Sequence, residues 1–197
     1  MDRPYSESCD QNREPILAVL REYVSDVEHL LEIGSGTGQH AVYFAPEFPH
    51  LTWHTSDRRE NHAGIQAWMA EMPAENLRSP LSLDVSQDAW PEHQFDVVFS
   101  ANTAHIMGEP DVVAMFEGVG RLLPAGGRFL LYGPFNIDGR YTAASNERFD
   151  QWLKGQDPRM GVRDRGWLEQ LADHAGMQLE QMVDMPADNK ILVWIKA

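Results

Sequence analysis

A glycine-rich run between residues 30 and 40 carries the residue types best suited to chemistry. An apolar segment ends at Glu32, and Gly34, Gly36 and Gly38 follow at alternate positions. Glycine lets the backbone turn sharply and approach a ligand closely, and the exposed N–H groups at the start of the next helix attract an anionic group. The run therefore predicts a nucleotide-type cofactor loop at the end of a first parallel strand.

The glycine spacing separates two classes of cofactor. A dinucleotide loop places its glycines as G-x-G-x-x-G, whereas this chain reads G-x-G-x-G, with Gln39 where the third dinucleotide glycine would stand. This spacing argues against an NAD-dependent oxidoreductase, which stays open as an alternative. The residues that we expect to bind the cofactor in this loop are Glu32, Gly34, Ser35, Gly36, Thr37 and Gly38.

Polar residues also follow the next three predicted strands. Asp57 closes the second strand about 20 residues after the glycine loop, where an acid accepts hydrogen bonds from ribose hydroxyls. Asp84 and Val85 end the third strand, and Asn102 follows the fourth. Ligands of doubly wound sheets bind outside the carboxyl ends of the strands. We therefore expect these four residues to contact the cofactor.

His105 follows Asn102 in the same loop and is the candidate catalytic residue. Its unperturbed pKa near neutrality suits a general base that takes a proton from an acceptor hydroxyl or amine. The alternative is a histidine that orders the loop or lines the pocket. No group of histidines, cysteines or carboxylates has the spacing of a metal site, so we expect no metal.

The pattern of apolar residues predicts alternating strands and helices. We expect strands at 29–33, 51–56, 77–83, 95–101 and 128–132, a C-terminal hairpin of 178–185 and 191–196, and helices at 12–23, 38–45, 61–72, 111–123, 145–154 and 165–175. Pro15 fits the first turn of the first helix, and Pro80 suggests an edge position for the third strand.

These elements predict one α/β domain over residues 1–197. Five strand–helix alternations indicate a Rossmann-like, doubly wound sheet with helices on both faces. The hairpin makes the sheet seven-stranded and mostly parallel, with one antiparallel strand at its edge.

Composition excludes several classes of protein. The formal net charge of −14 opposes binding to nucleic acid, which needs a basic surface. No apolar stretch is long enough to cross a membrane, and the N-terminus lacks the apolar region of a signal peptide. The single cysteine, Cys9, excludes an internal disulfide; we expect it to be a bystander in a mobile N-terminal segment. A cytoplasmic location is the expectation.

With these residues placed, the chain resembles the class I S-adenosylmethionine-dependent methyltransferases. Glu32-x-Gly34-x-Gly36-x-Gly38 is similar to their first motif, and seven strands with a final hairpin are similar to their fold. The resemblance implies that the loop wraps the amino-acid part of S-adenosylmethionine and that the last strand inserts antiparallel beside the fifth. It also implies that Asp84 contacts the adenine amino group and that the Val85 N–H lies at the ring.

A narrower resemblance covers essentially the whole chain. The chain looks like the uncharacterised bacterial family related to the animal methyltransferase-like 26 proteins, whose acceptor is not established. The motifs that carry this resemblance are Asn12-Arg13-x-Pro15-Ile16, the run from Leu31 to His40, Trp53 with Ser56-Asp57, Asn102 to Ile106, Tyr132 to Phe135, Ser145-Asn146 with Phe149-Asp150, and Gly161 to Asp164. Met160 departs from an expected tryptophan.

The acceptor side is the least determined part of the sequence. Residues 140–165 are locally net positive on an acidic chain. Segment 1–25 and the insertion 136–165 would fold over the cofactor as a lid, and Arg13, Arg140 or Arg163 would hold an anionic group of a small acceptor. Asn12, Tyr141 and Asn146 complete the expected acceptor site. The alternative is a salt-bridged structural loop.

The sequence therefore favours an S-adenosylmethionine-dependent methyltransferase acting on a small molecule, with S-adenosylhomocysteine as the product. A non-catalytic protein that binds S-adenosylmethionine as a sensor or interaction partner would carry the same motifs.

Overall fold

The computed structural model describes residues 3–197, and seven of its strands form one sheet in the order β3-β2-β1-β4-β5-β9-β8. β1 pairs in parallel with β2 and β4, and β2 with β3. β9 is antiparallel to both β5 and β8. The predicted α/β fold with one antiparallel strand from a C-terminal hairpin is confirmed. That strand, β9, lies inside the sheet beside β5, as the resemblance implied. The prediction that the antiparallel strand lies at the edge of the sheet is wrong, because β8 pairs with the outer side of β9 and takes the edge position.

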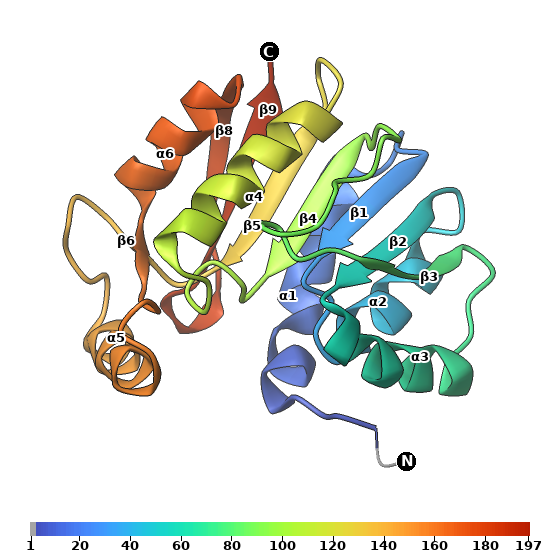
Figure 1. The fold of residues 1–197 in the computed structure, drawn as a ribbon, viewed down its shortest axis with the longest axis horizontal. Helices are drawn as coiled ribbons and strands as arrows, with labels where there is room; N and C mark the ends of the chain where they lie inside the picture. The colour runs from blue at the N-terminus through green and yellow to red at the C-terminus, as the bar shows by residue number, and fades with distance from the viewer. Residues whose placement is uncertain (1–2) are drawn as a thin grey trace. The chain divides into compact units, whose positions relative to one another are not determined.

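The chain divides into two compact units, the first ending at Ser100 and the second comprising Ala101–Ala197. The first unit, traced from blue to green in Figure 1, contains α1 (Glu7–Tyr23), β1 (His29–Ile33), α2 (Gln39–Phe44), β2 (Thr52–Asp57), α3 (His62–Glu71), β3 (Leu77–Ser82) and β4 (Val97–Ala101), with short 3-10 turns at Ala45–Glu47 and Arg59–Asn61.

An aromatic cluster forms much of the core of the first unit. Phe44 on α2 packs against Trp53 on β2 and Phe99 on β4, with ring centroids 5.7 and 6.0 Å away. All three side chains are fully buried, and large aromatic side chains contribute strongly to core stability. This packing fixes α2, and hence the loop that precedes it, against the carboxyl ends of the strands. β3 is the edge strand, as Pro80 predicted.

Helix α1 differs from the sequence prediction. It begins at Glu7, so Pro15 lies in its interior rather than in its first turn, and Cys9 belongs to the helix rather than to a mobile segment. A proline inside a helix removes one hydrogen bond and crowds the preceding turn. Burial of Ile16, Leu17 and Leu20 offsets this cost, because tertiary packing overrides local propensity.

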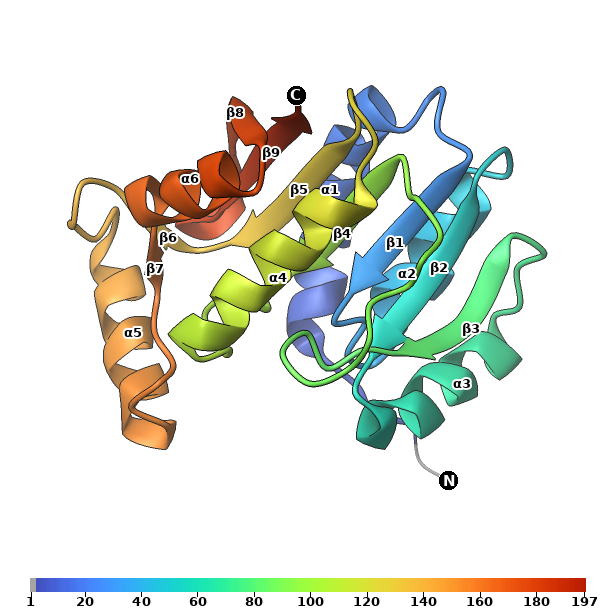
Figure 2. The same ribbon diagram turned by 45° about the horizontal axis from the view of Figure 1, so that its top comes forward.

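The second unit contains α4 (Glu109–Leu122), β5 (Arg128–Gly133), β6 (Phe135–Asn136), α5 (Ala144–Gln156), β7 (Arg163–Asp164), α6 (Arg165–His174), β8 (Met177–Asp184) and β9 (Lys190–Lys196), with a short 3-10 turn at Pro186–Asp188. Strands β6 and β7 pair in parallel as a separate two-stranded sheet. They were not predicted, because two residues are too few to show a period. Figures 1 and 2 both show α5 standing clear of α4 and α6 within this unit.

Among the described residues, no helix combines the length and apolar character needed to cross a membrane.

Candidate functional site

The glycine loop of the first unit is a turn in which all three glycines are left-handed. Gly34, Gly36 and Gly38 have φ of 70°, 58° and 92°, a region that other residues enter only at a cost. The N–H groups of Gly34 and Ser35 both donate to the Ser56 carbonyl, at 3.0 Å each. A Cβ on Gly38 would lie 3.0 Å from the Ile65 Cα, so this glycine is also required by close packing on α3.

Glu32 is a buried acid at the start of this loop. Its side chain is 2% exposed, and its Oε2 accepts hydrogen bonds from the Ser35 hydroxyl at 2.9 Å and the Trp53 indole N–H at 3.1 Å. Burial raises the pKa of Glu32 to about 7, and the two donors only partly oppose it. The carboxyl is therefore poised to change its charge near neutral pH. The sequence indicated Glu32 but not its partner Trp53.

Asp57 connects the end of β2 to the glycine loop. Its Oδ2 accepts from the Gly36 N–H at 2.7 Å. Its Oδ1 accepts from the Arg58 N–H at 2.7 Å and from the Asn61 side chain at 2.8 Å. These three bonds fix the carboxylate beside the loop, so it is preorganised for a ligand that approaches Gly36. Nothing in the sequence pattern singled out Asn61.

Asp84 and Val85 lie in the turn after β3. The Asp84 Oδ1 accepts from the N–H and hydroxyl of Ser86, at 3.2 and 3.1 Å, and the Asp84 N–H donates to Asp88 at 2.9 Å. The Val85 carbonyl accepts from the Trp90 indole at 3.1 Å. The turn is thus tied together by its own side chains. A role for both residues at an adenine ring stays a prediction.

The N-terminal segment is bonded to the start of α2 and to α3, all within the first unit. The Gln39 side chain accepts from the Ser6 N–H at 2.6 Å and donates to the Ser6 carbonyl at 3.2 Å. The Trp68 indole donates to the Pro4 carbonyl at 2.7 Å. Gln39 stands where a dinucleotide-binding loop would have its third glycine, and its side chain binds the N-terminal segment at the end of the glycine loop.

Asn12 and Arg13, expected on the acceptor side, both have partners in the first unit. Asn12 is buried, and its Oδ1 lies 2.8 Å from the His40 Nε2. Burial lowers the pKa of His40 to about 4, with the Arg13 charge as a smaller cause, so the ring is neutral at pH 7. Arg13 pairs with Asp10 at 2.9 Å and stacks over the Tyr43 ring. Acceptor binding by either residue stays a prediction.

Asn102 and His105 belong to the second unit. Asn102 is a non-glycine residue with φ of 58°, and its N–H donates to the Tyr132 carbonyl at 3.0 Å. Strain of this kind is concentrated at functional sites. His105 is 6% exposed, and its ring meets Phe149 edge-on at 5.1 Å. Burial, and to a lesser degree the Arg163 charge, lowers the pKa of His105 to about 4, which makes it a weak base at neutral pH.

Arg163 holds the loop that carries His105. Its buried guanidinium donates to the carbonyl of Ala104 at 3.1 Å, to that of Arg159 at 2.7 Å and to that of Met107. The Gly161 N–H donates to the His105 carbonyl at 2.9 Å. Glu109, which is mostly exposed, lies 3.6 Å away. These bonds hold the guanidinium in place within the second unit. Binding of an anionic acceptor group by Arg163 stays a prediction.

Asp150 organises α5 in the same unit. This carboxylate is 1% exposed and accepts from the Val162 N–H at 2.8 Å and from Tyr141 and Lys154 at 2.6 Å each. Burial raises the pKa of Asp150, but these donors outweigh it and hold the pKa below its usual range. Asn146 is also buried, and it donates to Thr142 and to the Asp188 carbonyl.

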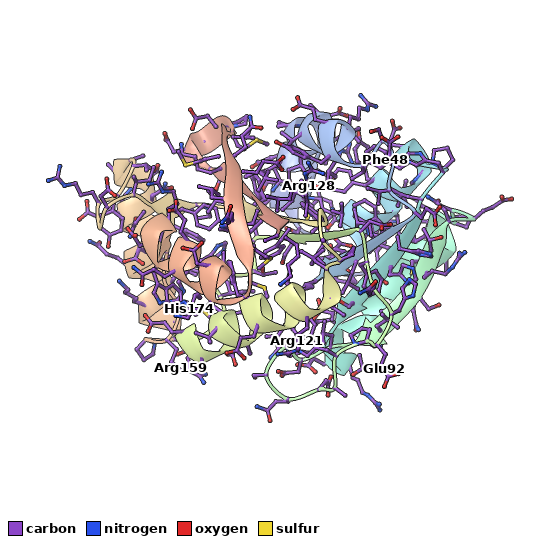
Figure 3. All side chains as sticks on the ribbon, turned by 90° about the horizontal axis from the view of Figure 1, so that it is seen from above. Phe48, Glu92, Arg121, Arg128, Arg159 and His174 are labelled. Carbon is purple, nitrogen blue, oxygen red and sulfur yellow. The ribbon has the colours of Figure 1, made fainter. Side chains whose placement is uncertain are left out.

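The predicted basic surface at residues 140–165 is largely neutralised. Lys154 pairs with Asp150, Arg159 with Asp157 and Arg165 with Glu169, at 2.6, 2.7 and 2.9 Å. Figure 3 shows Arg159 at the outside of the second unit. Arg140 is exposed, and its main chain bridges to Ile137. The described residues hold no group of three or more histidine, cysteine or acidic side chains arranged to bind a metal ion.

Several solved methyltransferases are similar to this chain in fold. An O-methyltransferase family protein from Burkholderia thailandensis matches with a TM-score of 0.81 and 15% identity over 93% of this chain and 56% of its own. Human N-acetylserotonin methyltransferase in complex with SAM matches with a TM-score of 0.80 and 17% identity over 97% and 53%. CalO1, a methyltransferase of calicheamicin biosynthesis in its SAH-bound form, matches with a TM-score of 0.74 and 22% identity over 94% and 54%.

The chain thus spans about half the length of these proteins, and the likeness establishes the fold. A family model matches nearly the whole chain, over residues 3–196. The chain belongs to that family, which is described as proteins of unknown function (DUF938).

Proposed function

We propose that this protein is an S-adenosylmethionine-dependent methyltransferase that acts on a small molecule. The observation that carries the proposal is the Gly34–Gly38 turn, whose three left-handed glycines are joined to Asp57 through the Gly36 N–H. The fold it shares with solved methyltransferases supports the same reading. The relation to the methyltransferase-like 26 proteins stays part of this proposal.

The residues of the loop fit such a cofactor. A Cβ on Gly36 would meet only the Gly34 carbonyl, at 3.9 Å, so the exposed side of the turn is open to a ligand. Asp57 stands beside it to accept hydrogen bonds from ribose hydroxyls. Glu32 provides a carboxyl whose ionisation is favoured by a nearby cation, and S-adenosylmethionine carries positive charge on its sulfonium and its ammonium.

When bound, S-adenosylmethionine supplies an electrophilic methyl group. Transfer of this methyl group to a lone pair of the acceptor would leave S-adenosylhomocysteine, and a proton on the attacked atom would pass to solvent or to a nearby base. The protein would contribute mainly by proximity and orientation. Asp57 and the glycine loop of the first unit would hold the cofactor. In the second unit, the loop from Asn102 to His105 carries the residue predicted as a general base.

His105 is proposed to order this loop rather than to take a proton. Its pKa of about 4 is far from a working pH near 7, and general bases work best when the two are close. A base role for His105 is kept as the competing hypothesis, because a histidine that is neutral at pH 7 can still accept a proton.

The experiment is methyl transfer from S-adenosylmethionine labelled in its methyl group to a small-molecule extract, followed by separation of labelled products. We expect a labelled product with the wild-type protein and a loss of at least tenfold with Asp57→Ala. Arg58→Ala, which changes the exposed neighbouring side chain, is the matched control. Binding of the cofactor without any labelled product would favour the non-catalytic alternative.

A further inference from the structure

Three aromatic rings of the second unit form a continuous row. His105 meets Phe149 edge-on with the ring centroids 5.1 Å apart, and Phe149 stacks on Trp152 with an interplanar angle of 13° and 5.9 Å between the centroids. The row begins at the loop after β4 and ends on α5. His105 is buried, Phe149 is partly exposed, and Trp152 is 58% exposed. The row therefore leads from the candidate site to the surface.

Large apolar side chains next to residues of the row are also exposed. Ile106 follows His105 in the chain, and Tyr141 bonds to Asp150, the neighbour of Phe149. Besides Trp152, Ile106 is 50% and Tyr141 is 38% exposed. Leaving a tryptophan in water forgoes the stabilisation that burial of its ring would give, so exposed aromatic groups of this kind mark binding surfaces. Phe149 already covers one face of Trp152, which leaves the other face for a ligand.

The row is held rigidly before any ligand arrives. Asp150 lies between Phe149 and Trp152 in sequence and is fixed by bonds to Tyr141, Lys154 and the Val162 N–H. The bond to Asp150 raises the pKa of Tyr141 to about 12, so its hydroxyl stays protonated and in place. A preorganised surface loses less entropy when it binds.

The size and charge of this surface select its ligand. The other exposed side chains of α5 near it are polar, namely Glu147, Arg148, Gln151 and Lys154. The apolar patch is therefore small, whereas a stable protein interface buries about 800 Å² on each partner. Arg163 and Lys154 are already occupied by carbonyls and by Asp150, whereas Arg148, which precedes Phe149 in the helix, is exposed. A comparison with an anionic probe is therefore part of the test.

We infer that the row of His105, Phe149 and Trp152 binds a planar aromatic ring of the methyl acceptor, by stacking on Trp152. This inference rests on the proposed function and replaces an anionic acceptor with an aromatic one. Heteroaromatic rings and benzene rings stack on tryptophan through dispersion and through their quadrupoles. Saturated rings lack this quadrupole, so stacking favours aromatic ligands over them.

The test first establishes by calorimetry that S-adenosylhomocysteine binds, and then measures binding of 2-naphthol to the loaded protein by saturation-transfer NMR. Cyclohexanol, which has a hydroxyl but no aromatic ring, and succinate, which is anionic, are the comparison probes. We expect 2-naphthol to bind in preference to both, with its affinity about five- to tenfold lower in Trp152→Ala. Gln151→Ala, an exposed neighbour on the same helix, should bind within twofold of wild type.

Equal binding of 2-naphthol to wild type and Trp152→Ala, or a preference for succinate, would overturn the inference. So would a dimer of the wild type that Trp152→Ala converts to monomer in analytical ultracentrifugation, because the row would then serve a second copy of the chain. If S-adenosylhomocysteine does not bind, the proposed function fails, and the 2-naphthol series on the unloaded protein still tests the row.

Discussion

The two units of this protein build their candidate sites in different ways. The glycine loop of the first unit is shaped by the main chain, through three left-handed glycines and N–H groups that bond to Ser56 and Asp57. The loop from Asn102 to His105 in the second unit is held by the buried side chain of Arg163. A site formed by the main chain depends on a short local motif, whereas a site formed by side chains depends on residues about 60 positions apart in sequence.

The largest expected effect comes from Gly38→Ala, which tests the main-chain site. The new Cβ would sit in a left-handed residue and 3.0 Å from the Ile65 Cα. We expect the free energy of unfolding, measured with urea, to fall by about 2–5 kcal/mol from strain and overpacking together.

The matched control is Gly139→Ala, which has φ of 72° and no atom within 4 Å of the new Cβ. Its free energy of unfolding should fall only by the conformational cost of a left-handed alanine, about 1–2 kcal/mol. If the two variants were equally stable, close packing at Gly38 would have no energetic role.

The corresponding change in the second unit is Arg163→Met, which keeps an unbranched apolar side chain and removes the guanidinium donors. Three main-chain carbonyls would lose their hydrogen-bond donor, so we expect the free energy of unfolding to fall by about 2–4 kcal/mol. Hydrogen exchange should speed up at the Gly161 N–H, which bonds to the His105 carbonyl. Arg159→Met, an exposed cation paired with Asp157, is the control and should cost less than about 1 kcal/mol. Unchanged exchange at Gly161 would show that Arg163 does not hold the loop.

The variant Glu32→Gln tests the buried carboxyl of the first unit through the pH dependence of stability. The pKa of Glu32 rises from 4.5 to about 7 in the folded protein, so the folded state binds the proton more tightly. The resulting stability is present below pH 4.5 and is lost as the pH rises toward 7. The amide of glutamine imitates the neutral acid. The free energy of unfolding of the variant should therefore match that of wild type at pH 4.5 and exceed it at pH 8 by up to about 3 kcal/mol.

Urea unfolding of both proteins between pH 4.5 and 8 measures this difference. The difference between the free energies of unfolding of variant and wild type cancels the contribution of the buried histidines. Their lowered pKa values destabilise the fold on the acid side in both proteins. A difference that does not change with pH would exclude a raised pKa at Glu32.

The smallest effect is expected from His105→Gln. A residue that only orders the loop should change kcat for methyl transfer by no more than about threefold, whereas loss of a general base costs about 10²–10⁴-fold. The rate should also show no inflection near pH 4, the pKa of His105, that the variant abolishes. A hundredfold loss of kcat in His105→Gln would restore the catalytic role.

The difference between the units also explains what could be predicted from sequence. Glu32, the three glycines and Asp57 fall within short motifs after strands, so they could be placed in advance, and the fold followed from the strand–helix alternation. The partners of Arg163 and the contact of His105 with Phe149 depend on the conformation of residues 101–164, which no local pattern encodes. The predicted start of α1 was wrong because it placed Pro15 in the first turn, whereas packing of the helix outweighs that local preference of proline.

The most direct test of the account is calorimetric titration of the full chain with S-adenosylmethionine, S-adenosylhomocysteine and NAD, in wild type and Asp57→Ala. The account predicts that S-adenosylmethionine and S-adenosylhomocysteine bind to wild type, that Asp57→Ala weakens both at least tenfold, and that NAD does not compete. Binding of NAD alone would contradict it.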